Sequence, residues 1–168
     1  MSKRKGVLIV IIVLVVLAAA VSVLAVLNRP GELPESGSVA VTSGGETLRV
    51  FTADELKALP YIEAQKEIVS SSFANDEGLF RGVPLRALLA EAGAPEGAQI
   101  VVRSEDGYVT AFPADEVYDS DNIFLAYSKD GEGLGSKDKN GTGPLRIVVT
   151  DDEFGTRCAK YVSEIEVR

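Results

Sequence analysis

Residues 82–93 read GVPLRALLAEAG and carry the clearest local signal in this chain of 168 residues. Pro84 suits the first turn of a helix, and Gly93 suits the position just after a helix ends. The apolar residues between them recur at helical spacing and form one stripe, which consists of Leu85, Leu88, Leu89 and Ala92. The stretch therefore predicts a short amphipathic helix that buries one face in a core.

Short strands are predicted on both sides of this helix, with glycine-containing turns between them. The expected strands are residues 39–43, 46–51, 99–103, 108–112, 122–127, 145–150 and 159–167, and residues 61–73 are extended in character. Thr52 and Glu55 form a capping-box pattern that predicts a second short helix over residues 53–58. Residues 113–117 predict one further helical turn. Many short strands with few short helices favour an α+β fold of mixed β-sheets.

The N-terminal part of the chain predicts a membrane anchor. Residues 7–27 read VLIVIIVLVVLAAAVSVLAVL and carry no charge. About 20 apolar residues in a helix span a bilayer core. We therefore expect a transmembrane helix at residues 6–27. A cleaved signal peptide is the alternative, although the apolar core of such a peptide is normally only about 7–15 residues long.

Charge and composition around this helix predict its orientation and the domain organisation. Lys3, Arg4 and Lys5 precede the helix, so the positive-inside rule makes residues 1–5 a cytoplasmic basic tail. Residues 28–38 read NRPGELPESGS, which is the composition of a linker. Residues 39–168 then form one extracytoplasmic domain of ordinary size. The predicted location is the cell membrane, with a single pass.

The composition excludes several classes of site. The chain has no histidine and a single cysteine, Cys158, and its net charge is −8. These features exclude a histidine-based triad, histidine-ligated haem, an intrachain disulfide and an iron–sulfur cluster. An excess of acidic residues also argues against nucleic acid as a partner. Cys158 fits a small buried side chain or, with Arg157 and Lys160 beside it, an activated thiol.

Acidic and basic residues are the remaining candidates for a site. The acidic clusters at residues 119–122 and 130–140 do not match the spacing of a calcium loop, so no metal ligand is predicted. No catalytic residue is assigned either. Three basic residues of the C-terminal third lie close to glycines, namely Arg146, Arg157 and Lys160. They suit a phosphate-like anion, and surface ion pairs with the many acids are the alternative.

Five segments, taken in order, resemble the molybdopterin-binding domain of the sulfite oxidase family. They are GVPLRALLAEAG (82–93), SEDGY (104–108), FLA (124–126), GPLRIVV (143–149) and KYV…IEV (160–167). The resemblance covers nearly all of residues 50–168. It implies mixed β-sheets with short helices, molybdopterin as the cofactor and oxidoreductase chemistry. A membrane redox partner is a further expectation.

The resemblance also implies which residues contact the cofactor. In the family an Asn-Gly…Pro-x-Arg stretch does so, and a Gly-x-Lys-x-x-Lys stretch follows it. The matching residues here are Asn140, Gly141, Arg146, Gly155, Arg157 and Lys160, with Arg157 in place of a lysine.

The chain departs from the family at one position that matters for function, the molybdenum-binding cysteine. The resemblance places a molybdenum-binding cysteine in the segment at residues 67–73, where this chain reads EIVSSSF. A serine oxygen is a harder ligand than a thiolate. Two readings follow, an oxidoreductase-like domain that binds a molybdopterin-type cofactor, and a non-catalytic module on the same fold that binds a ligand or a partner.

Overall fold

The computed structural model describes residues 11–22, 36–70 and 75–168. The chain divides into two units, Met1–Glu32 and Leu33–Arg168. In the first unit, residues 11–22 are helical. Within the described parts of the chain, no helix is long and apolar enough to cross a membrane.

Parts of several sequence predictions fall outside the described residues. They are the basic tail at residues 1–5, both ends of the expected membrane helix (6–10 and 23–27) and most of the linker (28–35). Residues 71–73 of the segment in which the resemblance places a thiolate also lie outside. These predictions stay predictions.

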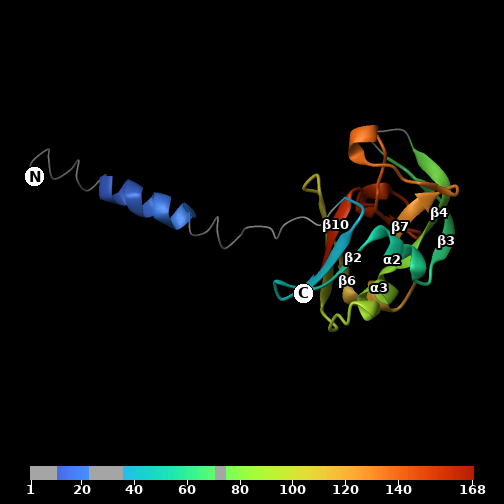
Figure 1. Ribbon diagram of the computed structural model, residues 1–168, viewed down its shortest axis with the longest axis horizontal. Coiled ribbons are helices and arrows are strands. Elements are labelled where there is room, and N and C mark those ends of the chain that lie inside the picture. Colours follow the sequence, from blue (N-terminus) through green and yellow to red (C-terminus); the bar gives the residue numbers. More distant parts are fainter. Residues whose placement is uncertain (1–10, 23–35, 71–74) are drawn as a thin grey trace, which may run out of the picture. The chain divides into compact units, whose positions relative to one another are not determined.

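The first of two sheets in the larger unit contains the two hairpins that the sequence predicts, at residues 39–51 and 99–112 (Figure 1). Its strands are β1 (Val39–Ser43), β2 (Glu46–Phe51), β5 (Gln99–Ser104), β6 (Val109–Pro113) and β10 (Val162–Val167). They lie in the order β2-β1-β10-β5-β6, and only the β1–β10 pair is parallel among them. Gly44 and Gly45 have φ of +59° and +83° and form the first turn, so the predicted hairpins are confirmed.

The second sheet positions the residues of the site described below. Its strands are β3 (Ile62–Ile68), β4 (Asp76–Pro84), β7 (Ile123–Lys129), β8 (Glu132–Gly133) and β9 (Arg146–Val149). The order is β3-β4-β7, and β7 then pairs with β8 at one end and β9 at the other. The strand β4, which the sequence analysis did not predict, pairs with β3 on one side and β7 on the other.

The helices are short and begin where the sequence predicts. In α2 (Ala53–Ala58), the Thr52 hydroxyl accepts the Glu55 N–H at 3.3 Å, and the Glu55 carboxylate accepts the Thr52 N–H at 2.8 Å. The helix α3 (Leu85–Glu91) buries its apolar stripe. The remaining helical segments are α4 (Ala114–Tyr118) and the 3-10 turns η1 (Lys137–Lys139) and η2 (Gly155–Arg157).

One apolar core joins the two sheets. Phe51 and Phe112 reach it from the first sheet, and Phe80 and Phe124 from the second, and all four side chains are fully buried. Burial of a large aromatic side chain contributes roughly 2–3 kcal/mol each. The described domain is thus an α+β fold of mixed sheets, which confirms the fold class expected from the sequence.

Candidate functional site

A cavity of about 490 Å³ lies where the end of β3, the start of β4, the start of β9 and η2 meet. Its lining consists of residues 68–70, 154–156 and 158–160, with Asp76, Asp106, Tyr108 and Arg146. We call this cavity the Arg146 pocket. Its volume falls within the range of about 300–1,000 Å³ that is typical of small-ligand sites.

Close packing at Gly155 holds two walls of the pocket together. The Gly155 N–H donates to the Val69 carbonyl at 2.9 Å. A Cβ atom at Gly155 would lie 2.2 Å from the Cγ2 atom of Ile68. Only glycine therefore lets η2 lie directly on the end of β3. On a third side, the Tyr108 hydroxyl donates to the Thr156 carbonyl.

Arg146 supplies a buried cation with a polar atom left unpaired. Its side chain is 3% exposed, and its Nη1 forms an ion pair with the Asp76 carboxylate. Among the described residues, its Nε is buried without a hydrogen-bond partner. An unpaired buried donor costs roughly 1–3 kcal/mol. The pocket therefore contains a cationic group with an unused donor.

The Asp76 carboxylate forms ion pairs with two cations, Arg146 and Lys129. Its other carboxylate oxygen lies 2.6 Å from the Nζ of Lys129. Partial burial of Asp76 acts to raise the pKa of its carboxyl. The hydrogen bond from Lys129 and the charge of Arg146 outweigh that effect and hold the pKa below its ordinary value. Asp76 is thus ionised at neutral pH and neutralises part of the positive charge.

The pocket brings together three of the six residues that the resemblance implies. They are Arg146, Gly155 and Lys160, and the backbones of Arg146 and Lys160 form an antiparallel bridge. The same cavity is lined by Ser70, which belongs to the segment where the resemblance places a thiolate. Sequence segments far apart in the chain therefore meet at one site.

The other three residues lie away from this cavity. Arg157 pairs with Glu116 at 2.7 Å and with Asp152 at 2.5 Å, and its guanidinium stands 5.1 Å from the centre of the Phe112 ring. The hydrogen bonds that the guanidinium donates to these carboxylates raise its pKa. Arg157 therefore forms ion pairs with acidic side chains, which was the alternative to an anion site.

Asn140 and Gly141 form part of a tight loop after η1. Asn140 has φ of +56°, and the Gly141 carbonyl accepts a hydrogen bond from the Tyr161 hydroxyl at 2.9 Å. A Cβ at Gly141 would lie 2.3 Å from the backbone of Gly135. These two residues shape the loop, and neither lines the Arg146 pocket.

Cys158 is the single cysteine of the chain, and it lines the Arg146 pocket. The residue is 5% exposed, and burial raises the pKa of its thiol above the ordinary value. The buried-side-chain interpretation therefore describes it better than an activated thiol. Among the described residues, no three His, Cys, Asp or Glu side chains gather into a metal-binding group.

Sequence reasoning did not identify Asp76, Asp106 or Tyr108 as pocket residues. Asp76 lies 70 positions before Arg146 in the chain, and only the β4–β7–β9 sheet order brings the two together. Asp106 lies in the turn between the predicted strands at residues 99–103 and 108–112, and Tyr108 follows this turn directly before β6. The position of this turn beside the pocket depends on the pairing of β5 with β10.

Comparisons with known proteins match both the sequence and the fold. A family model described as "Oxidoreductase molybdopterin binding domain" matches residues 32–168. The crystal structure of the sulfane dehydrogenase SoxCD from Paracoccus pantotrophus is similar, with 25% sequence identity and a TM-score of 0.59. The match covers 77% of this chain and 37% of that one, so the chain spans little more than a third of that protein's length. Among curated proteins, no match was found.

Proposed function

Because this chain belongs to the oxidoreductase molybdopterin-binding domain family, we propose that the Arg146 pocket holds the anionic part of a molybdopterin-type cofactor. The observation that carries the proposal is the buried Nε of Arg146, which has no hydrogen-bond partner among the described residues. A phosphate oxygen would accept this donor and remove the cost of leaving it unpaired.

Three further features of the pocket favour a phosphate site. Lys160 adds a second cation to the same wall. Gly155 lets η2 pack directly on the end of β3, which holds this wall of the pocket in place. The carboxylate of Asp76 holds the Arg146 guanidinium through its Nη1. These residues would bind and orient the cofactor, which supplies the redox chemistry of its own metal centre.

The residues present fit the metal end of the cofactor less well than its anionic end. The segment at residues 67–73 has serines and no cysteine. Molybdenum chemistry that depends on a thiolate from this segment is therefore not supported by the chain itself. This observation favours a second candidate, a non-catalytic module that binds an anionic ligand or a partner on the same fold.

Cofactor analysis of the full chain separates the two candidates. The chain would be expressed in a host that makes molybdopterin and purified in detergent. Molybdenum would be measured by mass spectrometry and pterin by fluorescence after oxidation. Molybdenum and pterin in near-stoichiometric amounts would support the oxidoreductase. Pterin without metal would support the binding module. The absence of both pterin and metal would contradict the proposed site.

Matched variants test whether the Arg146 pocket is the place of binding. Lys160→Gln removes a cation from the pocket wall, and Lys139→Gln removes one from an exposed position outside it. We expect pterin content to fall at least about tenfold in the first, because a charged hydrogen bond contributes about 1.5–3 kcal/mol. It stays unchanged in the second. Equal content in both variants would contradict the assignment.

We also propose that residues 6–27 anchor the chain in the cell membrane, with the N-terminus in the cytoplasm and the domain outside. The support is the uncharged apolar sequence and the exposure of the apolar side chains in the helix at residues 11–22, such as 60% for Leu14. A domain held there would exchange electrons or ligand with a membrane redox partner. Retention of the chain in carbonate-washed membranes, with digestion of the domain by external protease, supports this topology. Release of the chain by carbonate contradicts it.

A further inference from the structure

A second cavity, of about 510 Å³, lies at the other ends of β3 and β4. Tyr61 precedes β3, and Arg81 lies near the end of β4, whereas the Arg146 pocket begins at Ile68 and Asp76. At about 3.3 Å per residue, the length of β3 separates the two cavities. We call the second one the tyrosine pocket, and its lining includes Lys57, Tyr61, Arg81, Tyr127, Leu134 and Leu145.

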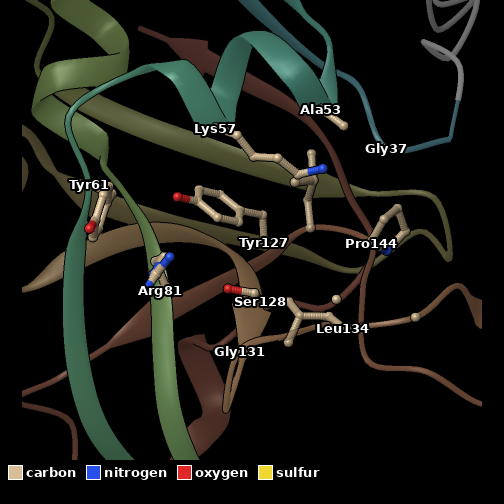
Figure 2. Close-up of a pocket in the computed structure, with 13 residues that line it drawn as sticks. Gly37, Ala53, Lys57, Tyr61, Arg81, Tyr127, Ser128, Gly131, Leu134 and Pro144 are labelled. Carbon is tan, nitrogen blue, oxygen red and sulfur yellow. The ribbon is translucent and has the colours of Figure 1, made fainter.

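Two tyrosine rings and an apolar floor make this cavity suitable for a flat ring. Figure 2 shows the Tyr127 side chain reaching into the cavity with its hydroxyl toward Tyr61. Leu134 and Leu145 are 8% and 1% exposed and form the apolar floor. Aromatic side chains stack or meet edge to face with a ligand ring, and each such pair contributes roughly 0.5–1.5 kcal/mol beyond burial.

The polar side chains that line the tyrosine pocket differ in how many partners they already have. The Arg81 guanidinium stands 4.7 Å from the centre of the Tyr61 ring, and its Nη2 lies 2.6 Å from the Glu63 carboxylate. The charge of Arg81 is therefore balanced by Glu63. For the Tyr127 hydroxyl, no hydrogen bond is found within the described residues. This hydroxyl is an available donor in a half-buried position.

Lys57 is the cation whose charge is least matched. Its Nζ lies 3.8 Å from Asp54, whose side chain is 98% exposed. Such a solvent-exposed pair contributes little. The side chain extends from α2 along the cavity (Figure 2). A carboxylate on a bound ring would therefore compete successfully with Asp54 for this ammonium group.

From these contacts we infer that the tyrosine pocket binds a small planar aromatic carboxylate. Its ring would lie against Tyr61 and Tyr127 over the leucine floor, and its carboxylate would accept a hydrogen bond from Lys57. The inference concerns a site separate from the Arg146 pocket, and it does not depend on the cofactor proposed there.

Binding of three small probes to the full chain in detergent tests this inference. Benzoate has both the ring and the charge, benzyl alcohol has only the ring, and acetate has only the charge. Saturation-transfer NMR and calorimetry would be corrected with empty micelles. We expect benzoate to bind a few-fold more tightly than benzyl alcohol, because its carboxylate pairs with an exposed lysine. We expect it to bind at least about tenfold more tightly than acetate, which lacks the ring. Equal affinities for the three probes would overturn the inference.

Variants locate the binding in the tyrosine pocket. Lys57→Gln should weaken benzoate a few-fold, because the Lys57 side chain is 57% exposed and an exposed ion pair contributes up to about 1 kcal/mol. Tyr127→Leu should also weaken it a few-fold, because it removes an aromatic ring from the wall of the cavity. Lys139→Gln, which removes an exposed lysine outside the cavity, should leave the affinity unchanged. Unchanged affinity in both Lys57→Gln and Tyr127→Leu would overturn the inference, as would equal losses in all three variants.

Discussion

Replacing Asp76 with asparagine tests how the charge of the buried Arg146 is balanced. Asparagine has almost the same shape, so packing is kept while the charge is lost. The Arg146 side chain is 3% exposed and that of Asp76 is 21% exposed. Breaking a buried ion pair costs about 3–5 kcal/mol. Because Asp76 retains some contact with water, we expect the lower end, about 3 kcal/mol.

Thermal unfolding of the full chain, followed by circular dichroism, measures this loss. A loss of about 3 kcal/mol corresponds to a fall in Tm of about 10 °C for a domain of this size. Asp54→Asn removes the same charge from a side chain that is 98% exposed, so its effect should stay within about 0.5 kcal/mol. Equal Tm values for the two variants would refute the reasoning.

Inorganic phosphate extends the same experiment to the site. In Asp76→Asn the Arg146 guanidinium has lost its carboxylate partner, so a phosphate ion can take that place. We expect phosphate to raise the Tm of Asp76→Asn by several degrees more than that of the wild type, because binding to the folded state stabilises it. No rise in either protein would show that phosphate does not reach Arg146.

Three further predictions concern pH, packing and the thiol. The pKa of Asp76 is lowered from 3.8 on folding. The difference in the free energy of unfolding between wild type and Asp76→Asn should therefore persist above pH 4 and disappear as the pH falls further. Urea titrations in which this difference disappears near neutral pH would contradict the prediction. Gly82→Ala should cost about 3 kcal/mol, because its Cβ would lie 2.2 Å from the Leu125 carbonyl oxygen, whereas Gly133→Ala, with open space around its Cβ, should be nearly neutral in the same assay. Since burial raises its pKa, the Cys158 thiol should react with a disulfide reagent at pH 8 roughly tenfold more slowly than in denatured chain; equal rates would contradict its burial.

Local chemistry explains which parts of the fold were predictable. The hairpin at residues 39–51 depends on the Gly44-Gly45 turn, and α2 depends on the Thr52–Glu55 capping box. Both signals lie within a few neighbouring residues. The strand β4 was missed because its sequence, DEGLFRGVP, contains two glycines and three charged residues. Glycines are unfavourable in an isolated strand, and here they permit close packing against β7.

Tertiary pairing explains why only part of the site could be predicted. Arg146, Gly155 and Lys160 were identified from the resemblance, and they do line one cavity. The sequence could not reveal that Asp152 and Glu116 engage Arg157, because Glu116 is 41 positions away. Nor could it indicate that Asp76 balances Arg146. Such partners depend on which strands lie side by side.

The most direct test of the proposed cofactor site is an experimental structure of the full chain purified from a host that makes molybdopterin. The account predicts that a phosphate oxygen of the pterin lies within about 3.2 Å of the Arg146 Nε, with Lys160 beside it. A pterin bound outside the Arg146 pocket, or one bound there with the Nε of Arg146 still unpaired, would contradict the account.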